Sequence, residues 1–190
     1  NAILLWPGCD RNIATKIWFG DAAATDAAFA RAAHVVSLRI EANRLAPNSM
    51  EARVSIGDYN PGDDKYTLYC STQNPHGVRN MLAQDILRVP ETAIRVVNYD
   101  VGGGFGLKGS AYPEDALVLW ASRRIGRPVK WSPLRGEALM GDTHGRDQVV
   151  RGSLALDDKG RMLAIRAQAL HALGAYTSGT LAPVEMSMRL

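Results

Sequence analysis

Alternating apolar and polar residues predict β-strands along much of the chain. Residues 51–59 and 65–72 lie on either side of the turn sequence NPGDDK, so they predict an antiparallel hairpin. Residues 147–157 and 161–174 meet at a second turn, DDKGR, and predict a longer hairpin. Shorter strands are predicted at residues 15–19, 34–43, 94–99 and 128–131.

Three further segments carry the signals of helices. Asp21 is a good cap for an Ala-rich run in which Phe29 is the one large apolar anchor. Pro75 suits the first turn of a second helix, which Pro90 ends. Residues 113–125 predict a third helix with a broad apolar face. That face is expected to consist of Ala116, Leu117, Leu119, Trp120 and Ile125.

The order of these elements does not follow strict alternation of strand and helix. It predicts an α+β fold in which helices pack on a mixed β-sheet. Without an internal repeat or a low-complexity linker, residues 1–190 are expected to form one domain. The chain starts at Asn1 and enters an apolar run without a cap, so we expect a truncated domain, with residues 1–18 as the end of a preceding linker.

Composition narrows the class of protein. Apolar residues make up 46% of the chain and charged residues 22%, as in ordinary globular proteins. The net charge of +3 is spread along the chain, which argues against nucleic-acid binding, and no apolar run is long enough to predict a membrane span. Cys9 and Cys70 form no disulfide framework, and no secretory signal is present, so a cytoplasmic location is expected. The four histidines are too widely spaced to predict a metal site.

The chemistry is concentrated in residues 100–109, DVGGGFGLKG, which follow a predicted strand. Glycines expose main-chain N–H groups and let a backbone approach an anionic or planar ligand. The segment does not fit a dinucleotide fingerprint, because Leu107 stands where the third glycine belongs. It does not fit a Walker A loop either, because Lys108 is followed by Gly109. A flexible connection stays open, although Phe105 is unusual in a plain linker.

The segment VGGGFGLK resembles the GGGFGxK motif of the molybdenum hydroxylases, the family of xanthine dehydrogenase, aldehyde oxidase and carbon-monoxide dehydrogenase. STQNPH at residues 71–76 resembles the STQN segment that this family places one strand ahead of the glycine motif. These motif sequences most resemble those of large subunits of the carbon-monoxide dehydrogenase type, most of which do not oxidise carbon monoxide. Further similar segments lie at residues 43–53, 123–131, 144–148 and 173–178.

This resemblance implies an oxidoreductase that hydroxylates an aldehyde, a heteroaromatic ring or a similar small substrate, with water as the oxygen source. The implied cofactor is molybdenum on a molybdopterin, of the cytosine dinucleotide type. Electrons would leave through 2Fe–2S clusters and FAD. The implied partners are an FAD-binding medium subunit and an iron–sulfur small subunit, assembled as a dimer of heterotrimers.

The resemblance also implies roles for individual residues. Gln73 matches the glutamine whose amide lies beside the oxo group of the metal. Gly104, Phe105 and Gly106 match the turn that passes the molybdenum, with main-chain N–H groups facing the oxygen atoms of the cofactor. No side chain is expected to ligate the metal directly. On the residues alone, Gln73 could instead cap the helix that begins at Pro75, and Phe105 could be a core aromatic.

Departures from the family pattern limit what this chain can do. Purine-oxidising relatives carry a glutamate after the motif lysine, where this chain has Gly109, so purines are disfavoured unless Glu114 takes that role. Lys108 is expected to be structural, and Cys70 a buried strand residue. The general base of the family is a glutamate in a later segment, so residues 1–190 are expected to hold no catalytic residue and to be inactive alone. A non-catalytic relative and a nucleotide-binding domain are the alternatives.

Overall fold

The computed structural model describes residues 3–5, 8 and 10–174 of the chain. These residues group into two compact units. The unit Leu45–Gly145 is called the inner unit, because it lies in the middle of the sequence, and Asn1–Arg44 with Arg146–Leu190 form the outer unit. The boundaries of the inner unit fall at the end of one strand, at Leu45, and at the beginning of another, at Gly145. No low-complexity linker marks either boundary in the sequence. The expectation of one domain across both units stays a prediction.

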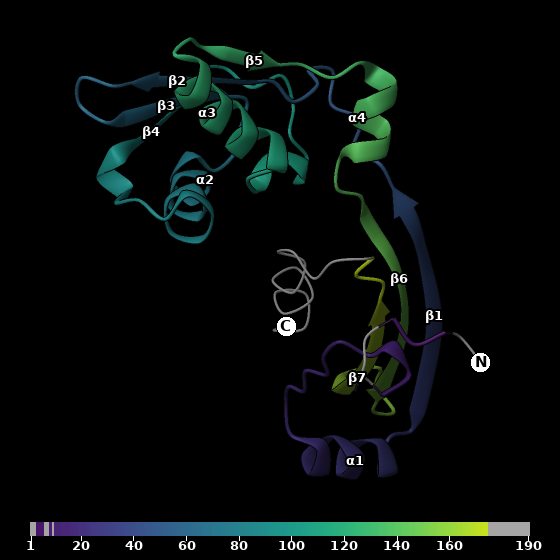
Figure 1. Cartoon of the computed structure of the whole chain (residues 1–190). Coiled ribbons are helices and arrows are strands. Elements are labelled where there is room, and N and C mark those ends of the chain that lie inside the picture. The colour runs from purple at the N-terminus through teal and green to yellow at the C-terminus, as the bar shows by residue number, and fades with distance from the viewer. Residues whose placement is uncertain (1–2, 6–7, 9, 175–190) are drawn as a thin grey trace. The chain divides into compact units, whose positions relative to one another are not determined.

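The inner unit contains a four-stranded mixed sheet in the order β4-β3-β2-β5 (Figure 1). β2 (Ser55–Asn60) and β3 (Lys65–Cys70) form the predicted antiparallel hairpin. β5 (Val129–Trp131) pairs antiparallel with β2, and β4 (Ile94–Val97) pairs parallel with β3. The predicted α+β fold with a mixed sheet is confirmed.

Helices α2 (Pro75–Met81) and α3 (Pro113–Ile125) pack on one face of this sheet (Figure 1). Beyond α2 the chain continues as a wider helical turn, η2 (Leu82–Leu87), and then as the short helix η3 (Glu91–Ala93). Both predicted helices are confirmed, while α4 (Arg135–Gly141) was not predicted. The shared core is apolar and consists of Tyr66, Leu68, Val78, Leu82, Ala83, Ile94, Val118 and Leu119.

The predicted buried face of α3 is largely wrong. Leu117 and Trp120 are 58% and 53% exposed, whereas the polar residues Asp115 and Ser122 are buried with Leu119. The reason is hydrogen bonding to β2: Asp115 accepts from the Ser55 hydroxyl, and the Ser122 hydroxyl accepts from the N–H of Tyr59 at 3.0 Å. Satisfied polar groups can be buried, so hydrophobic spacing alone misplaces the face of this helix.

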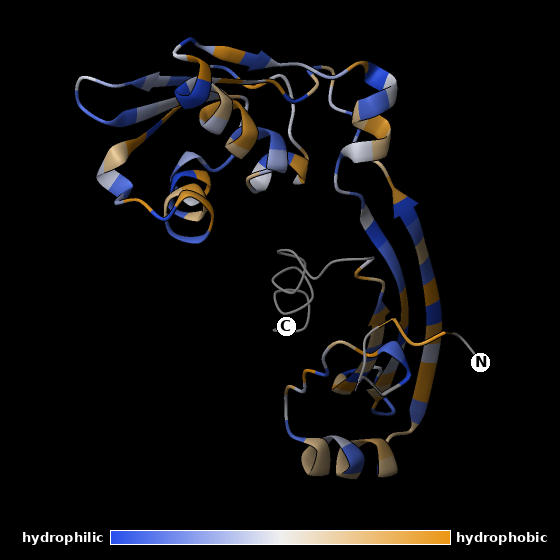
Figure 2. Ribbon diagram, in the orientation of Figure 1, coloured by the Kyte–Doolittle hydropathy of each residue, from blue (hydrophilic) through white to orange (hydrophobic). Residues whose placement is uncertain are grey.

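The outer unit contains a three-stranded sheet in the order β1-β6-β7. β6 (Gly145–Leu156) and β7 (Met162–His171) form the predicted long antiparallel hairpin, and β1 (His34–Leu45) is the predicted third strand. Figure 2 shows apolar and polar residues alternating along β1. The predicted strand at residues 15–19 is wrong: these residues form no strand, because an extended segment needs a neighbouring strand to satisfy its backbone.

Helix α1 (Ala22–Ala30) of the outer unit begins as predicted, because the Asp21 side chain accepts a hydrogen bond from the N–H of Ala24 at 2.9 Å. Ala28 is the buried residue of this helix. Phe29 is half-buried, and the guanidinium of Arg166 lies 4.3 Å from the centre of its ring. The helix is therefore anchored by a small residue and by an aromatic–cation contact.

Candidate functional site

The candidate site forms where two parallel strands end. β3 leads into Thr72 and Gln73, and β4 leads into the glycine-rich segment. Because β3 and β4 are parallel neighbours, their carboxyl ends lie at the same edge of the sheet. The Asn98 side chain joins the two ends by donating to the carbonyl of Thr72 at 3.2 Å.

Gln73 contacts the glycine turn directly. The N–H of Gly106 donates to Oε1 of Gln73 at 3.0 Å, and the main-chain N–H of Gln73 donates to the carbonyl of Lys108 at 2.9 Å. The Thr72 hydroxyl donates to the same carbonyl at 3.0 Å. Because Oε1 serves as the acceptor, the amide NH₂ of Gln73 is left to donate elsewhere, and it bonds to no other described residue.

Gln73 does not cap α2. Asn74 occupies the capping position, and its side chain accepts from the N–H of Gly77 at 3.0 Å. The capping alternative raised by the sequence is therefore wrong. Gln73 is exposed beside the turn and free to meet a ligand.

The turn at residues 104–106 needs its glycines for different reasons. A Cβ atom on Gly104 would lie 2.6 Å from Cγ of Gln73, so only glycine lets the glutamine lie against the turn. Gly106 has a φ of 95°, which disfavours other residues. Phe105 has a φ of 52°, and the residue is 75% exposed, so it is not a core aromatic of this unit.

Two main-chain donors at the turn have no acceptor within the described part of the chain. The N–H groups of Gly104 and Phe105 make no hydrogen bond to any residue that the structure describes. Together with the Gln73 amide they form a set of uncharged donors in which Gln73 and Phe105 are exposed and Gly104 is buried. This donor set fits the oxygen atoms of a molybdopterin-bound metal, and it also fits other anionic or polar groups.

Glu51, in the segment before β2, contacts the glycine-rich segment on both sides of the turn. Glu51 accepts a hydrogen bond from the N–H of Gly102, and its own N–H donates to the Gly102 carbonyl at 3.1 Å. The fully buried Lys108 side chain places Nζ 3.5 Å from Oε2 of Glu51, an ion pair in which Nζ makes no hydrogen bond to any described residue. Partial burial alone would raise the pKa of Glu51, but the Gly102 N–H, the Ser71 hydroxyl and the Lys108 charge outweigh it and lower that pKa.

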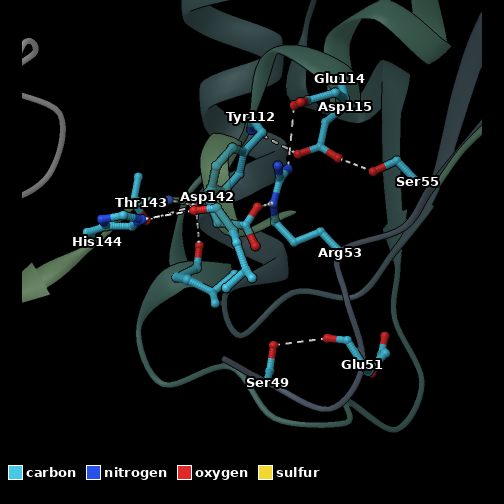
Figure 3. Close-up of polar contacts among 12 residues, drawn as sticks. Ser49, Glu51, Arg53, Ser55, Tyr112, Glu114, Asp115, Asp142, Thr143 and His144 are labelled. Atoms are coloured by element: carbon cyan, nitrogen blue, oxygen red, sulfur yellow. Dashed lines mark hydrogen bonds and ion pairs between the residues drawn. The ribbon is translucent and has the colours of Figure 1, made fainter. Parts of the chain in front are cut away.

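A second polar network fixes the start of α3 (Figure 3). The Arg53 guanidinium donates to Asp142 at 2.7 Å and lies 3.4 Å from Glu114 and 3.4 Å from the centre of the Tyr112 ring. The Tyr112 hydroxyl donates to the carbonyl of Leu107 at 2.8 Å, which links this network to the glycine segment. Glu114 is thus engaged by Arg53. Sequence reasoning missed this network, because nothing local connects its members.

Other candidate residues are not brought into the site. Cys70 lies in β3 as predicted but is half-buried, and burial, aided by the negative charge of Asp115, raises the pKa of its thiol to about 12. His76 lines a separate pocket of about 380 Å³ together with residues of β4. Across residues 3–5, 8 and 10–174 no three His, Cys, Asp or Glu side chains form a metal-binding group. Cys9 and most of the LGAYTS segment lie outside the described residues.

The fold and this turn define a cofactor-binding domain, and comparison with known proteins identifies its family. A model of the molybdopterin cofactor-binding domain matches residues 5–189. The chain belongs to the molybdopterin cofactor-binding domain family, and the resemblance found in the sequence is confirmed.

Named relatives agree with this assignment. The chain is 39% identical over 158 residues to the nicotine 6-hydroxylase large subunit of Paenarthrobacter nicotinovorans. It is 36% identical over 157 residues to the carbon monoxide dehydrogenase large chain of Hydrogenophaga pseudoflava. Each alignment covers 83% of this chain and 19% of the relative. The chain therefore spans about a fifth of the length of these relatives.

Solved structures share the fold. Quinoline 2-oxidoreductase from Pseudomonas putida 86 matches with a TM-score of 0.72 and 38% identity, over 79% of this chain and 19% of that one. A Cu,Mo-CO dehydrogenase matches with a TM-score of 0.73 and 34% identity, over 80% and 19%.

Proposed function

We propose that this chain is the part of a molybdenum hydroxylase large subunit that presents Gln73 and the turn at residues 104–106 to the molybdenum. The whole enzyme would oxidise an aldehyde, a heteroaromatic ring or a similar small substrate, with water as the oxygen source. The observation that carries the proposal is the hydrogen bond from the Gly106 N–H to Oε1 of Gln73, because it leaves the amide NH₂ as an outward donor beside the turn.

The residues of the turn then have defined tasks. When bound, the molybdenum–molybdopterin group supplies the two-electron oxidation of the substrate carbon. Gln73 donates from an amide that stays uncharged throughout, and the N–H groups of Gly104 and Phe105 act as fixed dipoles that need no reorganisation. The exposed Phe105 ring forms an apolar wall for a planar substrate. We propose the cytosine dinucleotide form of the cofactor from the likeness to carbon monoxide dehydrogenase large chains.

Heteroaromatic substrates are favoured within this class. The names of two relatives, nicotine 6-hydroxylase and quinoline 2-oxidoreductase, describe chemistry on nitrogen-containing rings. Purines remain disfavoured, because Gly109 lacks a side chain and Glu114 is paired with Arg53. An aldehyde is the second candidate substrate, because aldehyde oxidases belong to the family that the glycine motif resembles.

The whole enzyme needs partners that this chain does not contain. We propose an FAD-binding medium subunit and a small subunit with 2Fe–2S clusters, in a dimer of heterotrimers in the cytoplasm. Relatives named as a large subunit and as a subunit gamma of a complex support a multi-subunit enzyme. We also propose that both compact units belong to one domain, because a single family model spans them. Within the described residues, no helix has both the length and the apolar character to cross a membrane.

The nucleotide-binding alternative has less support. Phosphate-binding glycine loops place the ligand at the N-terminus of a long helix. Here the glycine turn runs into η4 (Leu107–Gly109), a short helix, and α3 begins only after Tyr112. Calorimetry with mononucleotides and dinucleotides would reveal tight binding if this alternative held.

The proposal is tested in the complete enzyme, with Gln73→Glu as the variant. The glutamate can still accept from Gly106, but an ionised carboxylate cannot donate, so we expect molybdenum to be retained and kcat to fall by about tenfold or more. Gln168→Glu, on an exposed position of β7, is the matched control and should leave kcat unchanged. Unchanged turnover in Gln73→Glu would refute the role of the amide. A correctly folded wild-type enzyme without molybdenum would indicate the non-catalytic relative instead.

A further inference from the structure

Lys108 occupies an unusual position for a lysine. Its side chain is fully buried, its Nζ makes no hydrogen bond to any described residue, and it forms an ion pair with Glu51, with Nζ and Oε2 3.5 Å apart. A buried ammonium group is costly unless it is paired, so the Glu51 carboxylate offsets part of the cost of burying Nζ. The side chain is buried and leaves the exposed surface of the turn to other groups.

The main chain of Lys108 holds Gln73 in place. Its carbonyl accepts from both the Thr72 hydroxyl and the N–H of Gln73, at 3.0 and 2.9 Å. The position of Gln73 is thus defined by residue 108, while the position of residue 108 is held by its own buried side chain.

Glu51 holds the opposite end of the same segment. Its carboxylate accepts from Gly102 N–H, and its backbone N–H donates to the Gly102 carbonyl. A Cβ atom on Gly102 would lie 2.9 Å from Oε2 of Glu51, so the close approach depends on glycine there. The carboxylate therefore contacts the glycine-rich segment on both sides of the turn, at Gly102 and at Lys108.

We propose that Glu51 and Lys108 are positioning residues, whose ion pair sets the spacing between the Gln73 amide and the turn at residues 104–106. This inference rests on the proposed function, since the spacing matters for a molybdenum centre that both groups face. The pair acts by fixing both ends of the glycine segment on one carboxylate. The donors of the turn then stay aimed at the cofactor without reorganising when it binds.

The test compares Lys108→Met, Glu51→Gln and the double variant in the complete enzyme. Lys65→Met is the matched control, because the pair of Lys65 with Asp63 is exposed. Each single variant should lower molybdenum occupancy about tenfold, alter the electron paramagnetic resonance spectrum of the molybdenum and speed hydrogen exchange in residues 102–109. Removing both charges should restore the unfolding midpoint, but not the spectrum or the exchange rates, because the bridge is still missing.

The outcomes separate a positioning role from a merely structural one. Wild-type occupancy, spectrum and exchange in Lys108→Met would overturn the inference, as would a double variant that recovers all three. If Lys108→Met does not fold, the double variant decides. A wild-type enzyme that binds no molybdenum would remove the proposed function. Faster exchange in the single variants, with the control unchanged, would even then show that the pair orders the turn.

Discussion

The close contact between Gly104 and Gln73 makes a single methyl group decisive. In Gly104→Ala the new Cβ would lie 2.6 Å from Cγ of Gln73, so the glutamine must leave the turn. Because Gln73 is exposed and its flexible side chain can move aside, we expect little loss of stability but loss of turnover in the complete enzyme. Thermal unfolding and steady-state kinetics measure the two effects.

Gly109→Ala is the control for this substitution in the same segment. No atom lies within 4 Å of a Cβ built on Gly109, and its φ is not in the left-handed region. Stability and turnover should stay near the wild-type values. Equal behaviour of the two variants would contradict the close contact at Gly104.

The thiol of Cys70 should be nearly inert at mildly alkaline pH. Burial raises its pKa from the ordinary value of 9.0 to about 12, so the thiolate fraction at pH 8 is lower by a factor of about a thousand. Labelling of the folded protein with iodoacetamide, followed by mass spectrometry, should show Cys70 reacting far more slowly than free glutathione, and labelling should accelerate as pH rises toward 12. Rapid labelling at pH 8 would contradict this environment.

Protonation of Glu51 should contribute to the loss of folding stability in acid. Its pKa is lowered in the folded protein, so its contribution to stability is present above 4.5, the ordinary pKa, and is lost as pH falls through the lower folded value. Wild-type protein should therefore lose stability below pH 4.5 more steeply than Glu51→Gln does. Unfolding midpoints across that range provide the measurement, and parallel curves would contradict the prediction.

At the scale of elements, β2 and α3 pack so closely that residue 57 must be glycine. A Cβ atom there would lie 2.6 Å from the main-chain N of Leu119, and backbone cannot move aside as a side chain can. We expect Gly57→Ala to destabilise the enzyme by about 3 kcal/mol. Gly136→Ala, in α4 with no neighbour within 4 Å, should be neutral or slightly stabilising. Thermal unfolding distinguishes the two, and similar midpoints would contradict the packing.

Elements whose signals are local could be predicted from the sequence. Helix α3 spans the predicted residues 113–125, because Pro113 and Gly126 mark its ends. Its buried face could not be predicted, because it depends on hydrogen bonds to a strand that is distant in sequence. The strand expected at residues 15–19 failed for a related reason: the pattern shows that a segment can extend, not that it has a neighbour.

The candidate site could be predicted only in part. The resemblance placed Gln73 near the glycine turn, and the parallel pairing of β3 with β4 supplies the physical reason. The ion pair of Glu51 with Lys108 and the network around Arg53 had no local signal. Each joins segments that meet only after the sheet has formed.

At the scale of the whole molecule, the chain should bind and position but not turn over. It spans about a fifth of the relatives it matches, and the general base that the family resemblance implies is a glutamate of a later segment. We expect the isolated 190-residue chain, mixed with cofactor, to show no oxidation of quinoline or an aldehyde, while the complete enzyme oxidises one of them. Dye-linked assays of both preparations test this, and turnover by the chain alone would contradict it.

Phe105 is less constrained by its surroundings than the glycines on either side of it. The glycines on either side are fixed by clash or by backbone geometry, whereas the ring projects outward and is mostly uncovered. Under the proposed function, exchanging this one outward side chain would alter the apolar wall that meets the substrate and leave in place the backbone that aims the donors.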